Sequence, residues 1–160
     1  MLLIAVVLLL CFCNASEAAE GVGVPSRFSF SIGGYGDYAG IKLHDGHFWQ
    51  FKSPDGKRMK EKRLRSPSPA QWQEFWSCLE TIELWKWAKT YKPRQMIDDG
   101  TQWAVEITWN GKSMKAEGDN AYPSEANPSL PVELNPDSTP FRELETGLEK
   151  LFGIKNVYRP

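Results

Sequence analysis

Residues 102–116, with the sequence QWAVEITWNGKSMKA, decide the fold class of this chain. Their first half alternates apolar and polar residues, which is the pattern of a strand with one buried face. The dipeptide Asn110-Gly111 follows and favours a two-residue type I′ turn between antiparallel strands. The resulting register places apolar residues opposite each other, Met114 with Ile107 and Ala116 with Val105. The chain is therefore expected to contain an antiparallel sheet that is buried on one face.

Two further strands are expected upstream of this hairpin. In the first, Phe28, Phe30 and Ile32 alternate with polar residues and predict another half-buried strand. In the second, residues 57–65, six of nine residues are Lys or Arg, and the two apolar residues fall on opposite faces. This composition is typical of an edge strand that charge protects from pairing with other chains. Binding of an anionic partner explains the same residues, and both interpretations stay open.

A second hairpin is expected at Asp45-Gly46, which lies between two apolar segments. Its register decides which side chains enter the core, because a shift of one residue moves every side chain to the other face. The two possibilities are a two-residue turn that pairs Leu43 with Phe48, and a three-residue loop that pairs Ile41 with Trp49. The three-residue loop collects more apolar bulk on one side of the sheet, so we predict that register.

Two amphipathic helices are predicted. The first opens with Ser68 as its N-cap, Pro69 at the first helical position and Gln71 as the partner in a capping box, and it ends near Glu83. The second is expected to begin around residue 139. Each helix carries a stripe of apolar residues at helical spacing. The stripes are Trp72, Phe75, Trp76, Leu79 and Ile82 in the first helix, and Phe141, Leu144, Leu148 and Leu151 in the second.

The order of these elements is several strands, a helix, a hairpin and a second helix. Because the strands are amphipathic, one face of the sheet is wet and two helices can cover the other. We therefore predict an α+β fold, a two-layer sandwich in which both helices pack on one face of an antiparallel sheet. Gly147 interrupts the second helix at a cost in helix propensity, which indicates close packing at that point.

The first residues have the pattern of an export signal. Residues 2–12 form an unbroken apolar run, and small and polar residues follow at positions 14–19. The run is shorter than the roughly 20 residues that cross a bilayer, which favours a cleaved signal peptide over residues 1–19. A lipid anchor or an uncleaved anchor is the alternative, because Cys11 and Cys13 lie in this stretch. We expect one secreted or periplasmic domain over residues 20–160, with membrane contact only through an uncleaved leader.

Composition argues against several classes of protein. The chain has 19 Lys and Arg against 20 Asp and Glu, so it has no overall attraction to nucleic acid. Removal of the leader leaves Cys78 as the only cysteine, which excludes an internal disulfide and fits a core residue better than a nucleophile. His44 and His47 are the only histidines and flank a turn, so we expect no metal and no cofactor.

The best candidate site is one corner of the predicted sheet. Asp99 precedes the first strand of the central hairpin, and Asn120 and Tyr122 follow its second strand. Antiparallel pairing brings these three residues to the same end of the sheet. The loop over residues 119–140 is rich in Pro and has no periodicity, so we expect it to form a rim. The alternative is that the same polar groups brace this long loop.

Part of this corner resembles a known family. The resemblance rests on the run Asp99-Gly100-Thr101-Gln102-Trp103, then Gly118, then Asn120-Ala121-Tyr122-Pro123, which is similar to a pattern in a family of uncharacterised bacterial proteins. It extends over residues 72–151 and leaves the first strands unmatched. The family has no assigned activity. The resemblance therefore implies a bacterial source and a corner worth testing, but no catalytic residues.

No pair of a nucleophile and a base stands out in the sequence. We therefore expect an exported binding or interaction module that uses Asp99, Asn120 and Tyr122. The sequence does not identify its partner, and both an envelope component and another protein fit. The alternative is a small hydrolase of the cell envelope that uses Asp98 or Asp99 with a metal or a water. A third possibility is an envelope protein that its basic strand holds on anionic surfaces.

Overall fold

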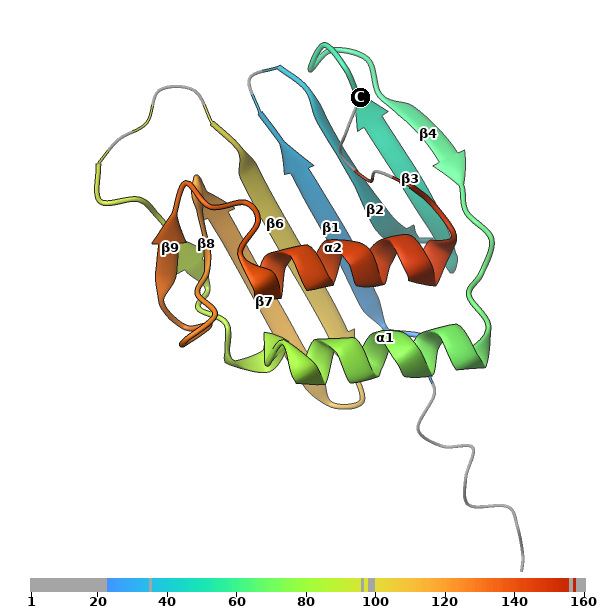
Figure 1. Ribbon diagram of the computed structural model, residues 1–160. Coiled ribbons are helices and arrows are strands. Elements are labelled where there is room, and N and C mark those ends of the chain that lie inside the picture. Colours follow the sequence, from blue (N-terminus) through green and yellow to red (C-terminus); the bar gives the residue numbers. More distant parts are fainter. Residues whose placement is uncertain (1–22, 35, 96, 98–99, 156, 158–160) are drawn as a thin grey trace, which may run out of the picture.

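The computed structural model describes residues 23–34, 36–95, 97, 100–155 and 157. Its main feature is a seven-stranded sheet with the order β4-β3-β2-β1-β6-β7-β5, and two helices, α1 and α2, pack across one face (Figure 1). Neighbouring strands are antiparallel except β5 and β7, which are parallel. The predicted α+β architecture, with both helices on one face of an antiparallel sheet, is therefore confirmed. The strands are β1 (Arg27–Gly33), β2 (Tyr38–His44), β3 (His47–Ser53), β4 (Lys60–Arg63), β5 (Thr90–Tyr91), β6 (Gln102–Trp109) and β7 (Lys112–Asp119).

The central hairpin, β6 and β7, forms as the sequence predicts. Asn110 and Gly111 have φ of 47° and 74°, as a type I′ turn requires. The predicted register is observed, with Ile107 opposite Met114 and Val105 opposite Ala116. All four of these side chains are buried, because this face of the hairpin lies under the helices.

The register of the β2–β3 hairpin differs from the prediction. Its turn has two residues, both with positive φ. Leu43 lies opposite Phe48, and Ile41 lies opposite Gln50 rather than Trp49. Phe48 consequently faces the helices and is only 3% exposed.

The reason for this register lies on the other face of the sheet. Phe51 is opposite Gly40, and its ring lies over that glycine. A Cβ atom at position 40 would lie 2.5 Å from the Phe51 ring, so only glycine leaves room for it. The predicted three-residue loop was wrong because it placed all the apolar bulk on one face. The other face also carries aromatic rings, since Tyr38 and Trp49 lie on it together with Phe51.

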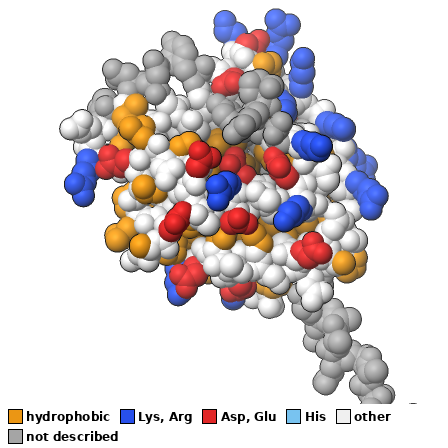
Figure 2. Space-filling view, in the orientation of Figure 1, with side chains coloured by type: hydrophobic (Ala, Val, Ile, Leu, Met, Phe, Trp, Pro, Cys, Tyr) orange, Lys and Arg blue, Asp and Glu red, His pale blue; other side chains and the backbone are white. Residues whose placement is uncertain are grey.

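Both helices begin where the sequence predicts. α1 (Pro69–Thr81) has both halves of the capping box, since Gln71 N–H donates to Ser68 Oγ and Ser68 N–H donates to Gln71 Oε1. α2 (Thr139–Phe152) ends at Gly153, whose φ of 63° is typical of a helix C-terminus. Side chains of both charges lie over the outward surface of the helices (Figure 2).

The two helices are in close contact at the predicted glycine. A Cβ atom at Gly147 of α2 would lie 3.3 Å from both Cys78 Sγ and the Phe75 ring of α1. The missing side chain thus lets the helices approach, which confirms the interpretation of this glycine.

Aromatic residues dominate the core between the sheet and the helices. One group of rings meets edge to face or at a tilt: Phe28, Phe48, Trp72, Phe75 and Phe152. Trp76 continues it, stacked between Trp72 at 5.1 Å and Trp109 at 4.2 Å. Burial of one such ring stabilises the fold by about 1.5–3 kcal/mol, so this layer is a main source of its stability.

The segment after β7 is more ordered than its sequence suggests. Residues Ala121–Pro123 form β8 and Pro131–Glu133 form β9, and the two pair as a small antiparallel sheet with Tyr122 opposite Val132. Upstream, the connection from α1 to β5 contains a short 3-10 helix, η1 (Leu84–Lys86). The expectation of a long loop without regular structure over residues 119–140 therefore needs correction: the hairpin covers part of it.

The predicted signal peptide, residues 1–19, lies outside the described residues. Within the part of the chain that the structure describes, no helix combines the length and the apolar character needed to cross a membrane.

Candidate functional site

The predicted corner is held together by Asn120. This residue is 5% exposed and has a φ of 50°, a conformation that Asn tolerates better than most residues. Its N–H donates to the Thr101 carbonyl at 2.9 Å, and its Oδ1 accepts from Thr101 N–H at 2.8 Å. Its carbonyl accepts from Leu134 N–H at 2.8 Å, which ties β9 to the end of β7. In this geometry Asn120 braces the loop, the alternative that the sequence left open.

Tyr122 lies beneath this corner, in the core. It is 2% exposed, and its ring stacks near Trp103 at 6.3 Å and meets Phe141 edge to face at 5.0 Å. Such burial gives a ligand no access to the ring in this conformation. Asp99, the third predicted residue, lies outside the described residues, so its part in binding stays a prediction.

Two glycines near the corner, Gly100 and Gly118, are packed closely against larger side chains. A Cβ atom at Gly100 would lie 1.8 Å from Asn120 Oδ1, and one at Gly118 would lie 2.1 Å from Trp103 Nε1. The Trp103 indole N–H also donates to the Ala121 carbonyl at 3.0 Å. These contacts pack this end of the sheet closely.

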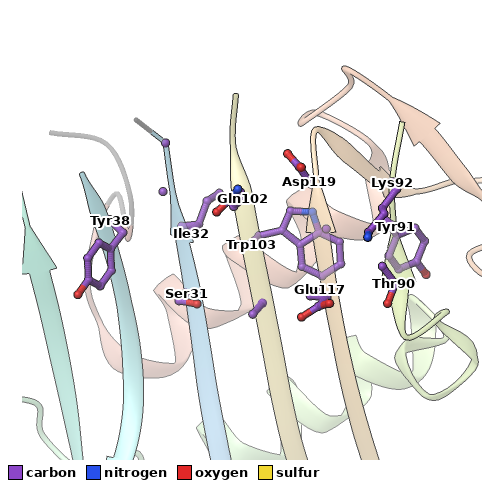
Figure 3. Close-up of a pocket in the computed structure, with 14 residues that line it drawn as sticks. Ser31, Ile32, Tyr38, Thr90, Tyr91, Lys92, Gln102, Trp103, Glu117 and Asp119 are labelled. Carbon is purple, nitrogen blue, oxygen red and sulfur yellow. The ribbon is translucent and has the colours of Figure 1, made fainter. Parts of the chain in front are cut away.

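A hollow lies directly beside this corner, on the face of the sheet away from the helices. It has a volume of about 500 Å³. Figure 3 views it with the helices behind the strands, and shows Tyr38 on one side and Glu117, Asp119, Thr90 and Lys92 on the other. We refer to it below as the open-face hollow.

The sheet register explains why the surface is hollowed here. Directly opposite residues of neighbouring strands face the same side, so they form rows across the sheet. One row runs Tyr38, Gly33, Gln102, Asp119, and the next runs Gly40, Ser31, Ala104, Glu117, Thr90. The middle of both rows is occupied mainly by short side chains. Longer side chains flank this stretch, with Tyr38 on the β2 side and Glu117 and Asp119 on the β7 side, so the rows form a trough.

The two walls of the trough differ in chemistry. On the β2 side, Tyr38 is 38% exposed and packs edge to face on Phe51 at 6.0 Å, so it offers an aromatic surface with a hydroxyl. On the β7 side, Glu117 and Asp119 lie two residues apart on the same face of one strand and supply two carboxylates. Asn120 Nδ2 donates to Asp119 Oδ1 at 3.0 Å and so orients one of them. The predicted Asn120 is not itself a lining residue, and it acts on the hollow through its neighbour Asp119.

The arrangement suits hydrogen bonding better than covalent chemistry. Carboxylates accept hydrogen bonds, the Gln102 amide both donates and accepts, and the Ser31 and Thr90 hydroxyls do the same. No group of three His, Cys, Asp or Glu in the described chain is placed to hold a metal ion.

The two histidines lie opposite each other at the end of the β2–β3 hairpin, on the surface. Their nearest polar partners are separate, since His47 Nδ1 lies 3.1 Å from Arg63 and His44 Nε2 lies 3.3 Å from Asp45. The structure therefore brings them side by side without completing a metal site among the described residues.

Cys78 lies half-buried in the groove between α1 and α2. Its thiol donates a weak hydrogen bond to the Glu143 carbonyl at 3.5 Å. Burial, with a smaller contribution from the Glu143 charge, raises the pKa of this thiol above its usual value. A raised pKa lowers the thiolate fraction, which makes Cys78 a poor nucleophile. Its half-buried side chain in a groove differs from the core residue that the sequence favoured.

Sequence reasoning missed the residues that form the hollow. Ser31, Gln102 and Glu117 appear as ordinary polar positions of amphipathic strands, because each strand alone gives no hint of its neighbours. One available signal was that Gly33, Gly40 and Ala104 are small residues at positions on the polar side of their strands. Using it requires the strand order, since β1 pairs with β6 across a gap of many residues.

Comparisons with protein-family models, with curated proteins and with solved structures found no match for this chain.

Proposed function

We propose that this chain is a small binding module, exported as its first residues predict, whose open-face hollow takes a small ligand rich in hydroxyl groups, such as a sugar unit. The observation that carries the proposal is the trough of short side chains between two carboxylates and an exposed tyrosine. A concave surface with a few convergent polar groups is the usual form of a small-molecule site.

The ligand class follows from the side chains of the two walls. Glu117 and Asp119 are acceptors, and hydroxyl groups are matching donors. The Tyr38 ring provides an apolar surface against which the C–H face of a sugar ring packs. A ligand with a large negative charge would meet the two carboxylates unfavourably, with Lys92 as the one cation among the described residues that line the hollow.

A thermal-shift screen followed by calorimetry tests this proposal. The compounds are monosaccharides, disaccharides and peptidoglycan fragments, with amino acids and phosphate for comparison. A hydroxyl-rich ligand is expected to raise the unfolding midpoint, because it binds the folded state only. Ala104→Tyr is expected to fill the trough and abolish the shift, and Glu117→Gln to weaken it.

Glu106→Gln provides the matched control for Glu117→Gln. Glu106 lies on the same face of the sheet outside the hollow, where it pairs with Arg27. It is expected to leave ligand binding unchanged. Binding that survives Ala104→Tyr, or a screen in which no hydroxyl-rich compound binds, would refute the proposal.

The alternative of a carboxylate-dependent hydrolase stays a prediction, because Asp98 and Asp99 lie outside the described residues. The hydrolase alternative is tested by measuring turnover and melting temperature of the Asp99→Asn variant. Lost turnover with an unchanged melting temperature would support catalysis, whereas a large fall in melting temperature would mark Asp99 as a brace. A secreted or periplasmic location is likewise part of the proposal, and fractionation of the producing cells tests it.

A further inference from the structure

Positive charge is concentrated at the β4 edge of the sheet. Residues 23–65 contain nine Lys and Arg against four Asp and Glu, whereas residues 66–160 contain ten against fourteen. Figure 2 shows Lys and Arg side chains gathered along the side of the molecule where β4 lies. The net charge of the whole chain is close to zero, but the β4 edge is basic and the rest of the chain is acidic. The local charge, rather than the net charge, decides what a surface attracts.

On the open face of this edge, the charges have partners. Lys42 Nζ lies 2.7 Å from Glu61 Oε1, and Arg63 lies 3.1 Å from His47 Nδ1. These contacts are local and explain why cationic residues are tolerated on that face.

On the helix side of the same edge, the charges lack such partners. Lys52 of β3 lies directly opposite Lys60 of β4, and Lys62 follows on the same face. None of the three forms an ion pair within the described residues. Like charges directly opposite each other destabilise a sheet. Charged residues on β4 are enough to keep this edge strand from pairing with another chain. That role does not explain why Lys52 and Lys60, which repel each other, lie opposite each other on β3 and β4.

An exposed apolar residue directly precedes β4 at this edge. Met59 is 48% exposed and lies between Arg58 and Lys60 in the sequence. An exposed apolar side chain among cations is typical of surfaces that bind at a membrane interface, where the cations meet headgroups and the apolar group enters the boundary below them.

We propose that this edge, formed by Lys52, Lys57, Arg58, Met59, Lys60 and Lys62, binds the surface of an anionic phospholipid bilayer. Clusters of four to eight Lys and Arg are the usual basis of such binding. An acidic peptide that adds as a strand fits less well, because β4 has only four residues and offers few backbone hydrogen bonds. The edge lies on β3 and β4, away from the open-face hollow, so this proposal does not rest on the proposed function.

Co-sedimentation with vesicles tests the proposal on the full chain. One vesicle type is phosphatidylcholine alone, and the other is phosphatidylcholine mixed with phosphatidylglycerol. The apolar residues 2–12 contribute to both types, so the relevant quantity is the difference between them. We expect binding to be stronger to the anionic vesicles and the difference to disappear as salt is added.

Two triple variants separate this edge from general charge. Lys52→Gln, Lys60→Gln and Lys62→Gln together are expected to weaken binding to anionic vesicles roughly a hundredfold, since each Lys near such a surface contributes about a factor of five. Lys89→Gln, Lys115→Gln and Lys150→Gln remove the same charge from exposed positions elsewhere and are expected to have little effect. Met59→Ser is expected to weaken binding without changing its dependence on salt.

Three results would overturn the proposal. The first is equal binding to neutral and anionic vesicles, and the second is an equal loss in both triple variants. The third is binding to polyglutamate but not to anionic vesicles, which would assign the edge to an acidic protein segment. Melting temperatures of both triple variants serve as a check that the sheet stays intact.

Discussion

Asn120 and Thr101 are joined by a reciprocal pair of hydrogen bonds, in which each backbone N–H donates to an oxygen of the other residue, at 2.9 Å and 2.8 Å. One of these oxygens is Asn120 Oδ1. A side-chain oxygen therefore continues the hydrogen bonding between β6 and β7 one residue beyond the end of the paired strands. These two hydrogen bonds hold together the end of the sheet at which the open-face hollow lies. Asn120 also donates to Asp119, a residue that lines the hollow, and so orients its carboxylate.

Asn120→Ala is expected to destabilise the protein by about 2–3 kcal/mol. The substitution leaves the Thr101 N–H without its acceptor and places alanine in a left-handed conformation. Urea unfolding measures the loss. Asn120→Asp keeps an acceptor oxygen and is expected to lose less. If the alanine variant is as stable as the parent protein, Asn120 is not the brace described above.

Tyr91 is expected to make stability depend on alkaline pH. Its hydroxyl is buried, donates to the Pro128 carbonyl and accepts from Ala88 N–H at 2.8 Å. Burial raises the pKa of Tyr91 from 10.0 to about 12. Because the folded state favours the neutral phenol, Tyr91 contributes to the free energy of unfolding. That contribution is complete below pH 10 and is lost as the pH rises toward about 12.

Urea midpoints measured across this pH range test the expectation, with Tyr91→Phe as the variant. It is expected to be less stable near neutral pH by about 1–3 kcal/mol, because it leaves a buried donor and acceptor unpaired. It is also expected to lose less of its stability at alkaline pH than the parent. Tyr38→Phe, at an exposed position, is the control. An identical alkaline loss in the parent and the Tyr91 variant would contradict the assignment.

Gly147→Leu is expected to destabilise the protein by about 1–3 kcal/mol, because the added side chain overpacks the contact between α1 and α2. The nearest atoms belong to Cys78 and Phe75, both at 3.3 Å from an added Cβ. Cys78→Ala removes one of them, so the double variant is expected to recover part of the loss. Chemical unfolding of the parent, both single variants and the double variant gives the four stabilities of a double-mutant cycle. Simple additivity would show that these two positions do not meet.

Ser68→Ala is expected to cost about 1 kcal/mol through loss of the N-cap of α1. The hydroxyl accepts from Gln71 N–H at 3.3 Å, and no other described side chain caps this helix end. Thermal unfolding is the measurement. Ser66→Ala, an exposed position just before the helix, is the control and is expected to be neutral. Equal effects at both positions would argue against the capping box.

The sequence by itself determined the features that depend on neighbouring residues along the chain. Alternation over residues 102–109 and the Asn110-Gly111 turn fixed the central hairpin and its register. The Ser68–Gln71 pattern fixed the start of α1, and the apolar stripes fixed the faces of both helices. Each of these signals comes from backbone geometry and periodicity within one element, so no knowledge of the rest of the molecule was needed.

Only the tertiary structure decided the features that depend on which strands become neighbours. The β2–β3 register follows from the room that Gly40 leaves for Phe51, on a face that the sequence pattern treated as solvent. The open-face hollow exists because β1 pairs with β6, which sets Ser31 beside Ala104. Side-chain periodicity tells which face of a strand is buried, but the shape of a sheet surface depends on side chains from several strands. Their alignment is set by long-range pairing, which no single stretch of sequence contains.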